Sequence, residues 1–273
     1  MIVDYHTHNR LCKHAEGEIE EYIESAVRLG LDEIACSDHA PLPGDYDSRH
    51  RMTLEQFNSS YSPMVSSLAE RYAGKIRIRR AIEVDYLGWF SEWNRSFIAE
   101  NDFDFVLGSV HFIGQEGNEK ALFGPEYGRD QLEALYEGFF EAIAESARSG
   151  LFDVVSHCDI VKKFGRFTSR RVRDLTYAAM EEIRKADLCI EVNTSGFRKP
   201  EREQYPGTEI LSIARDLGIP LTIGSDAHSP QDVGRDFDKA AELIELYGNG
   251  KIAVFEKRRR SMVSISRTGS QHA

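Results

Sequence analysis

The chain opens with two histidines that directly follow a short apolar run. His6 and His8 come after residues 2–5, which have the composition of a short strand. In a strand, residues two apart point to the same face, whereas in a helix they diverge, so the imidazoles lie side by side only if this stretch is extended. Neutral imidazoles are common ligands of transition metals. The pair therefore predicts one part of a metal site.

Most of the other histidines also fall where a predicted strand ends. Of the nine histidines, seven lie at or just beyond the end of a short apolar run, and only His50 and His272 do not. A single buried histidine usually makes a structural hydrogen bond, but seven at equivalent positions do not fit that role as a set. With two acidic residues at the same kind of position, the predicted donors are His6, His8, His14, His39, Glu83, His111, His157, Asp226 and His228.

Nine donor residues exceed what one four-coordinate ion can use. The sequence therefore predicts two or three divalent transition metal ions, with Glu83 as a bridge because each carboxylate oxygen can bind one ion. Two ions about 3.5–4 Å apart hold a shared water, lower its pKa and present hydroxide to a phosphorus atom. Zinc, iron, manganese and cobalt all stay open as the metal, because mixed nitrogen and oxygen sites accept each of them.

These side chains need a scaffold that gathers many strand ends. Short apolar runs alternate along the chain with amphipathic helical segments, several of which stop at a glycine such as Gly30, Gly150 or Gly218. Seven β–α units in strict alternation predict a parallel sheet with right-handed crossovers. Because polar residues follow all seven strands, an α/β fold closed into a distorted (β/α)7 TIM-like barrel explains their positions better than an open sheet.

Three segments carry more specific expectations. Thr53 is expected to cap a helix that Pro63 breaks or restarts. Residues 114–129 read as a glycine-rich loop. The stretch from residue 257 is basic and then polar, which favours a solvated or frayed end. No linker or shift in composition divides the chain, so we expect a single domain over residues 1–273, with residues 257–273 as a polar tail.

Composition narrows the classes of partner. The 273 residues include 45 acidic and 34 basic side chains, for a formal net charge of −11 at pH 7, which disfavours a DNA or RNA partner. The four cysteines show no C-x-x-C spacing, and no apolar run approaches the length of a membrane span. We expect a cytoplasmic protein that acts on a small-molecule phosphate ester without a nucleic-acid or membrane partner. The oligomeric state is not determined by the sequence.

Taken together, these motifs resemble the PHP (polymerase and histidinol phosphatase) superfamily. The resemblance rests, in chain order, on His6-x-His8, His14, Ser37-Asp38-His39, Glu83-Val-Asp85, Gly108-Ser-Val-His111, His157 and Gly224-Ser-Asp226-Ala-His228. Residues 109–113, 157–165 and 191–200 are similar to its histidinol-phosphate phosphatase branch in particular. The family implies the PHP fold, a distorted seven-stranded barrel, with a trinuclear metal centre.

The resemblance also implies how the donors divide among the ions and what reaction they serve. The first ion would be bound by His6, His8, Glu83 and Asp226, the second by Glu83, His111 and His157, and the third by His14, His39 and His228. The implied activity is that of a histidinol-phosphatase of histidine biosynthesis, which releases L-histidinol and phosphate from L-histidinol phosphate.

A phosphate ester also needs binding groups beyond the metal ions. Arg198, two residues after a predicted strand-end turn, is the first candidate because a guanidinium group matches phosphate oxygens best. Further candidates for substrate binding are Lys162, Lys163 and Arg166. Two carboxylates beside predicted metal ligands, Asp38 and Asp85, are expected to orient a histidine or relay a proton.

Three other functions stay open at this point. The first is a different PHP phosphoesterase that acts on another phosphomonoester, a nucleotide or a DNA end, although the chain has no basic stripe for a DNA strand. The second is a metal-dependent amidohydrolase, which also opens with H-x-H but bridges its metals with a modified lysine where this chain has Glu83. The third is an inactive metal-binding scaffold, which a missing donor would indicate, and no donor is missing.

Overall fold

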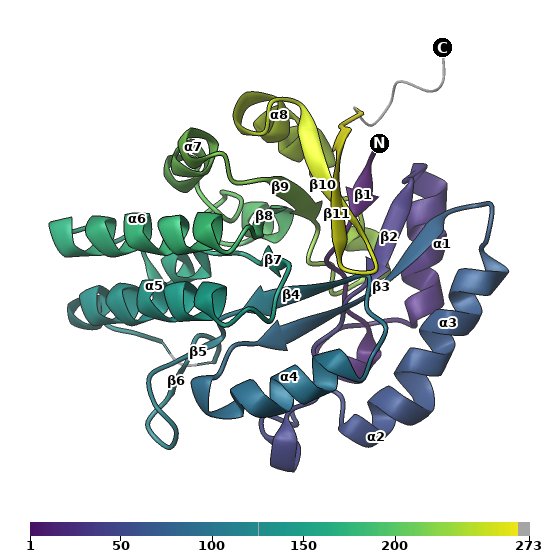
Figure 1. The fold of residues 1–273 in the computed structure, drawn as a ribbon, viewed down its shortest axis with the longest axis horizontal. Coiled ribbons are helices and arrows are strands. Elements are labelled where there is room, and N and C mark those ends of the chain that lie inside the picture. The colour runs from purple at the N-terminus through teal and green to yellow at the C-terminus, as the bar shows by residue number, and fades with distance from the viewer. Residues whose placement is uncertain (125, 267–273) are drawn as a thin grey trace.

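Seven short parallel strands form the centre of the computed structural model, which describes residues 1–124 and 126–266 (Figure 1). In their order around the sheet they are β1 (Val3–Asp4), β2 (Glu33–Cys36), β3 (Arg77–Asp85), β4 (Phe105–Ser109), β7 (Val154–Val155), β8 (Cys189–Asn193) and β9 (Leu221–Gly224). Each strand pairs in parallel with the next. The chain therefore moves from each strand to its neighbour through an outer crossover.

The sheet nearly closes on itself between its first and last strands. The Tyr5 N–H donates to the Ile223 carbonyl at 3.0 Å, and Thr7 pairs with Ala227 in a parallel bridge just beyond the strand ends. This nearly closed barrel of seven parallel strands confirms the predicted fold class. Closure places the carboxyl ends of all seven strands around one opening.

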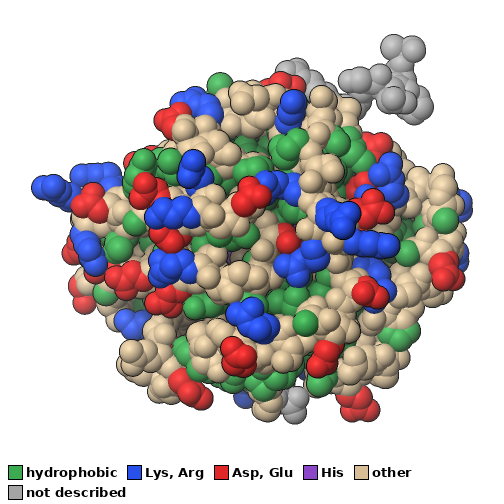
Figure 2. Space-filling view, viewed as in Figure 1, with side chains coloured by type: hydrophobic (Ala, Val, Ile, Leu, Met, Phe, Trp, Pro, Cys, Tyr) green, Lys and Arg blue, Asp and Glu red, His purple; other side chains and the backbone are tan. Residues whose placement is uncertain are grey.

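Helices cover the outside of the barrel (Figure 1). They are α1 (Ile19–Leu29), α3 (Ser62–Arg71), α4 (Ser91–Ala99), α5 (Leu132–Arg148), α6 (Arg170–Lys185), α7 (Thr208–Leu217) and α8 (Phe237–Tyr247). Gly30 and Gly218 close α1 and α7 with left-handed φ angles of 69° and 71°, the conformation that glycine adopts at little cost. On the face shown in Figure 2, acidic and basic side chains are interspersed. None of the described helices is long and apolar enough to cross a bilayer.

The barrel strands are buried on both faces. Val3, Ile34, Ile82, Leu107 and Ile190 are all fully buried. Helices cover the outer face of the sheet while side chains fill its interior, so strands such as β4 and β7 have no alternation of apolar and polar residues, whereas β3 starts with three exposed or half-buried positions among its first four residues.

The helical region after Thr53 restarts as an α-helix at Ser62 with Pro63 in its first turn, which is one of the two outcomes that the sequence predicts. The Thr53 hydroxyl accepts from the Gln56 N–H at 3.1 Å and caps α2 (Leu54–Gln56). The helix does not break, but widens into a π turn over Phe57–Tyr61, immediately before α3. A proline lacks an N–H and its ring crowds the carbonyl of the preceding turn, so a wider turn at this point accommodates both effects.

The predicted glycine-rich loop contains part of a small hairpin. β5 (Phe112–Ile113) pairs antiparallel with β6 (Lys120–Ala121), and the chain reverses between them through Gly114 and Gly117, with φ angles of 107° and 76°. Strands of two residues carry too little alternation of apolar and polar side chains to be recognised in a sequence.

Of the two alternatives predicted from residue 257, a solvated or a frayed end, fraying is wrong for residues 259–264, which form a paired strand with mostly exposed side chains. β10 (Lys251–Glu256) pairs antiparallel along its whole length with β11 (Arg259–Ser264). The turn between them is Lys257-Arg258, both at positive φ, a conformation that Asn-Gly usually supplies in such hairpins. Backbone pairing holds β11 while most of its side chains stay exposed, which explains its polar composition. Residues 267–273 of the predicted tail lie outside the described residues.

Candidate metal centre

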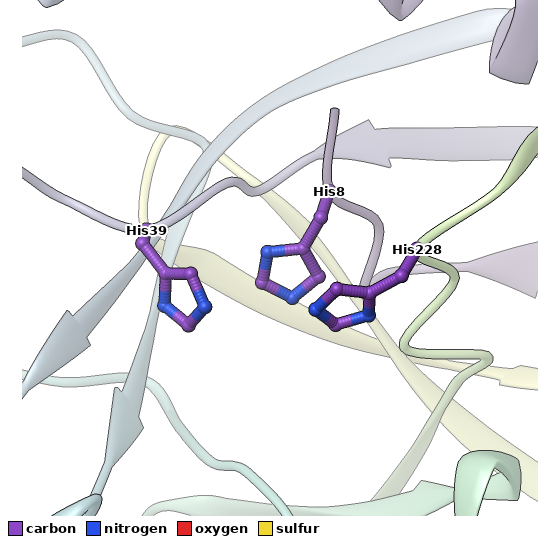
Figure 3. Close-up of side chains that lie close together, drawn as sticks. All are labelled: His8, His39 and His228. Carbon is purple, nitrogen blue, oxygen red and sulfur yellow. The ribbon is translucent and has the colours of Figure 1, made fainter. Parts of the chain in front are cut away.

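The predicted donor histidines converge at the opening of the barrel. His8, His39 and His228 come from three distant segments, yet their rings lie together (Figure 3). The ring centroid of His8 is 4.4 Å from that of His39 and 4.2 Å from that of His228. His14 joins this group, 4.9 Å from His228. Barrel closure thus brings together residues that are up to 220 positions apart in the chain.

Glu83 lies at the centre of the cluster with both oxygens facing histidines. Its Oε1 is 3.2 Å from His157 Nε2 and 3.4 Å from His6 Nε2. Its Oε2 is 2.8 Å from His39 Nδ1 and 3.6 Å from His8 Nε2. The side chain is almost completely buried. This is the arrangement that a carboxylate shared between two ions requires.

The donor atoms form several compact groups of three. Within each group all donor atoms lie within 4.8 Å of one another, and the groups are His8–His39–His228, His6–His8–Glu83, Glu83–His111–His157, His39–Asp85–His111 and His8–Cys12–Asp38. Asp226 adds a carboxylate oxygen 3.2 Å from His8 Nε2. Because the groups are distinct but share His8, His39 and Glu83, they fit more than one ion.

Buried atoms without partners test whether metal ions suit this site. His6 Nε2, His39 Nδ1 and Glu83 Oε2 are buried and make no hydrogen bond in the described part of the chain, although the last two atoms lie 2.8 Å apart. Leaving such an atom unpaired costs about 1–3 kcal/mol, and a bound cation would remove that cost. Imidazole nitrogens and carboxylate oxygens are also the donors that zinc, iron and manganese accept. The residues present therefore fit divalent transition metal ions.

Burial and charge compete in setting the protonation of these groups. Burial disfavours the protonated form of His6, but the carboxylates of Glu191, Glu83 and Asp226 outweigh it and raise its pKa well above the usual range. Burial opposes ionisation of Glu83, yet the charges of His39 and His6 hold its pKa well below the usual range. The central carboxylate is therefore ionised at neutral pH, and metal binding must displace protons from histidines such as His6.

Further carboxylates hold the histidine rings by the nitrogen on the far side from the cluster. Asp38 Oδ1 is 3.1 Å from His8 Nδ1, and Asp85 Oδ1 is 3.0 Å from His111 Nδ1. Both acids are buried, and Arg51 Nη2 donates to Asp85 at 2.7 Å. These are the contacts that an orienting carboxylate makes, because they fix the tautomer and direction of a ring that binds metal.

Glu191 makes the same kind of contact, although it is not among the residues that the sequence singles out. Its Oε1 is 2.8 Å from His6 Nδ1, and its Oε2 accepts from the His157 N–H at 3.0 Å and from Asn193 Nδ2 at 3.0 Å. The side chain comes from β8 and is almost completely buried. An acidic residue inside an otherwise apolar strand was the available signal, since such a residue is almost never fully buried without a partner.

All of the predicted donors except the fully buried His6 line a cavity of about 590 Å³. Its other walls come from the loop after β2, the loop after β6, and the segments after β7 and β8, through Asp47, His50, Arg51, Phe123, Gly124, Ile160, Lys163, Phe164, Ser195, Lys199, Pro200 and Tyr205. Burial, and then the neighbouring charge of Lys199, lower the pKa of Lys163 to about 8. The cavity therefore joins metal donors, two lysines and aromatic walls.

Lys163 is the one predicted phosphate-binding residue that the structure places in this cavity. Arg198 turns away from it, and its Nη2 donates to the Ser225 carbonyl at 2.8 Å, with Asp232 and Asp236 also near its guanidinium group. The next residue, Lys199, lines the cavity instead. Residues Thr194–Arg198 form a 3-10 helix, in which successive side chains point about 120° apart, so the side facing the cavity is not evident from the sequence.

Lys162 and Arg166 also lie outside the metal cavity. Lys162 Nζ donates to Glu203 Oε2 at 2.9 Å, and Arg166 Nη2 donates to the same oxygen at 2.9 Å. Both residues line a second cavity on the outside of the barrel. Lys162 and Lys163 belong to one 3-10 helix, Ile160–Phe164, and point to different cavities.

His50 reaches the metal cavity although no strand precedes it. Its ring centroid is 5.7 Å from that of His14 and 4.7 Å from that of Phe123. Its Nδ1 lies 2.6 Å from Asp47 Oδ1, so a carboxylate in the same loop holds this ring as well. The direction of a loop residue follows from tertiary packing, and no sequence period indicated it.

Comparison with known proteins gives matches over most of the chain. The family model described as PHP domain matches residues 4–195, and the model described as PHP-associated matches residues 208–237. A probable histidinol-phosphatase of Deinococcus radiodurans is 35% identical over 260 residues, which cover 94% of this chain and 98% of the relative. The histidinol-phosphatase of Bacillus subtilis is 28% identical, over 88% of this chain and 98% of that protein.

Solved structures share the fold over nearly their whole length. A putative histidinol phosphatase of Listeria monocytogenes superimposes with a TM-score of 0.78 at 25% identity and covers 87% of this chain and 99% of that chain. The histidinol phosphate phosphatase of Lactococcus lactis, solved in complex with zinc, L-histidinol and phosphate, has a TM-score of 0.76 at 23% identity. It covers 95% of this chain and 98% of that chain.

Proposed function

The chain belongs to the PHP domain family, and from that premise we propose that it is a metal-dependent phosphomonoesterase that hydrolyses L-histidinol phosphate to L-histidinol and phosphate. The observation that carries the proposal is the set of donors around Glu83 in a cavity that also contains Lys163 and Lys199. Relatives named histidinol-phosphatase, matched over almost their full length, support the substrate.

The proposed division of the metal ligands gives Glu83 two ions. The first ligand set is His6, His8, Glu83 and Asp226, the second is Glu83, His111 and His157, and the third is His14, His39 and His228. Two of the compact donor groups, His6–His8–Glu83 within the first set and Glu83–His111–His157 as the second, support this division. When bound, such ions polarise phosphoryl oxygens and lower the pKa of water. The proposed ligands come from residues 6–228, which supports the prediction of a single domain.

The chain's own residues bind the ester and hold the ligands in place. Lys163 and Lys199 supply ammonium groups for the phosphate oxygens, in the role first considered for Arg198. Asp38, Asp85 and Glu191 hold metal-binding rings through the nitrogen that faces away from the cluster. These contacts keep the donors in one arrangement while the ester binds.

The remaining walls of the cavity suit a small ester with a planar group. Phe123, Phe164 and Tyr205 provide aromatic surface beside His50, and a volume of about 590 Å³ is in the range of small-molecule sites. The sequence-based predictions of a cytoplasmic location and of no nucleic-acid or membrane partner stay predictions.

The decisive experiment compares phosphate release from four substrates. L-histidinol phosphate is tested beside an aryl phosphate, a phosphodiester and a 5′-phosphorylated single-stranded DNA, before and after chelation and after manganese or zinc is restored. We expect kcat/KM for L-histidinol phosphate to exceed the others by at least 100-fold and to vanish on chelation. If the aryl ester, the diester or the DNA end is turned over as fast, the substrate assignment is wrong and the alternative PHP phosphoesterase activity replaces it.

A further inference from the structure

A second cavity, of about 680 Å³, lies on the outside of the barrel. It is bounded by the 3-10 helix Ile160–Phe164, by α5 and α6, and by the beginning of α7. Its apolar lining comes from Tyr136, Phe140, Phe167, Val172, Ile210 and Ile213. None of the nine proposed metal ligands lines it, and the proposed phosphatase reaction uses none of its residues.

A buried lysine at this cavity is already fully occupied. Lys162 Nζ donates to Asp159 Oδ2 at 2.9 Å, to Glu203 Oε2 at 2.9 Å and to the Gln204 carbonyl at 2.6 Å. An ammonium group has three protons, and each has an acceptor here. Lys162 therefore neutralises the neighbouring acids and has no donor left for a ligand.

Asp159, in contrast, has one oxygen without a partner. Its Oδ2 accepts from Lys162 and from the Gly207 N–H at 2.8 Å, whereas its Oδ1 is buried and has no hydrogen-bond partner within residues 1–124 and 126–266. The residue is only 6% exposed and lines the cavity. A buried carboxylate oxygen is costly to leave unpaired, so a small movement of Asp159 that exposes this oxygen to the cavity would give a ligand a strong acceptor.

The first turn of α7 adds hydrogen-bond donors beside this acceptor. The N-cap residue is Gly207, which has no side chain to cap the turn. The first N–H groups of a helix have no intrahelical partner, and those of α7 belong to Thr208, Glu209 and Ile210, which line the same cavity. The helix dipole also favours a negative group at this end. One cavity therefore holds an acceptor for a cation and donors for an anion.

From this juxtaposition we propose that the second cavity binds a small zwitterion, namely an α-amino acid with an apolar or aromatic side chain. Its ammonium group donates to Asp159 Oδ1, its carboxylate accepts from the first turn of α7, and its side chain packs against Phe167 and Ile213. A simple amine leaves the helix N–H groups unpaired, and a simple acid leaves Asp159 unpaired. The proposal rests on these residues and not on the proposed function.

The two cavities share one short structural element. Asp159 and Lys162 line the second cavity, while Ile160, Lys163 and Phe164 line the metal cavity. Because these five residues are consecutive or nearly so, a shift of Asp159 toward a ligand displaces the lysine that faces the ester. We therefore expect an amino acid in the second cavity to change KM for the phosphate ester more than kcat; this coupling, unlike the binding itself, rests on the proposed function.

Calorimetric titration of the metal-loaded full chain tests the binding. The probes are L-phenylalanine, L-histidine, 2-phenylethylamine, which lacks the carboxylate, and 3-phenylpropionate, which lacks the ammonium group. Saturating inorganic phosphate is present so that the metal cavity is occupied. We expect at least one amino acid to bind at least tenfold more tightly than the amine and the acid. Binding of neither amino acid, or equal binding of the amine, overturns the proposal.

Two substitutions locate the site, and a third serves as a control. Asp159→Asn removes the charged acceptor, while Ile213→Trp fills the cavity without touching the Asp159–Lys162 pair, and both should weaken amino-acid binding at least tenfold. Asp216→Asn, on the exposed side of α7, should leave it unchanged. Unchanged binding in both cavity variants overturns the proposal, and an unchanged KM with bound amino acid overturns the coupling between the cavities.

Discussion

Replacing Glu191 with glutamine tests whether the contacts behind the ligands control metal binding. The carboxylate accepts hydrogen bonds on both oxygens, with His6 on one side and with the His157 N–H and Asn193 on the other. An amide has only one oxygen, so in Glu191→Gln the NH2 group must face either His6 Nδ1 or the two donors on the other side. Turning the NH2 toward His6 loses the fewest contacts, but it makes His6 Nδ1 the acceptor and moves the ring proton to Nε2, the nitrogen that faces Glu83.

The expected loss follows from the loss of one ligand nitrogen. Changing a residue that orients a metal-binding histidine typically lowers metal affinity by about 10–100-fold. That range corresponds to about 1.4–2.7 kcal/mol. We expect the upper half of the range here, because Glu191 also holds the backbone of His157, a second proposed ligand.

The assay is a titration of zinc and of manganese into chelator-stripped protein, with kcat/KM for L-histidinol phosphate measured at each metal concentration. At saturating metal, kcat/KM of the Glu191→Gln variant should come within a few-fold of the wild-type value, since Glu191 contacts no residue that faces the ester. Glu133→Gln, an exposed residue of α5, is the matched control and should titrate like the wild type. Wild-type metal affinity in a folded Glu191→Gln protein would refute the orienting role of this carboxylate.

Four further predictions concern the metal, the lysines and a close packing contact. Chelation should lower Tm by at least about 5–10 °C, the change expected when metal leaves a single site that was held near 100-fold above its Kd. Restored metal should reverse the change in a thermal melt. Because the pKa of Lys163 is about 8, its positive charge is present below that pH and lost above it. KM should therefore rise about tenfold between pH 7 and pH 9. A KM that does not change with pH over this range would exclude Lys163 from phosphate binding. Lys199→Met should raise KM at least tenfold, whereas Arg198→Met should lower Tm and leave KM within twofold. The reverse pattern in steady-state kinetics would show that Arg198, and not Lys199, binds the phosphate group. Gly224→Ala should lose metal affinity as strongly as Glu191→Gln in the same titration, because an added Cβ would lie 2.0 Å from Glu191 Oε1 and displace it.

The order of the elements and the type of barrel could be predicted from local patterns. Each strand is a short apolar run and each helix has a 3.6-residue period, and both signals depend only on near neighbours in the chain. Gly30 and Gly218 end α1 and α7 as expected, and seven donor histidines lie where predicted strands end. Strand β11 was missed because its evidence is backbone pairing with β10, to which exposed side chains contribute no pattern.

The candidate site also has features that local patterns predict and features that they do not. The donor residues could be predicted because a closed parallel barrel brings its strand ends to one opening, so position along the chain determines position in space. The directions of Arg198, Lys162 and Lys163 could not, since in a 3-10 turn a shift of one residue turns a side chain by about 120°. Lys199 follows such a turn in extended backbone, and the sequence does not show where the turn ends. The roles of Glu191 and His50 likewise depend on partners on other strands and loops. The sequence by itself thus determined the fold type and the donor set, whereas tertiary packing alone decided which side chains support the donors and which face the ester.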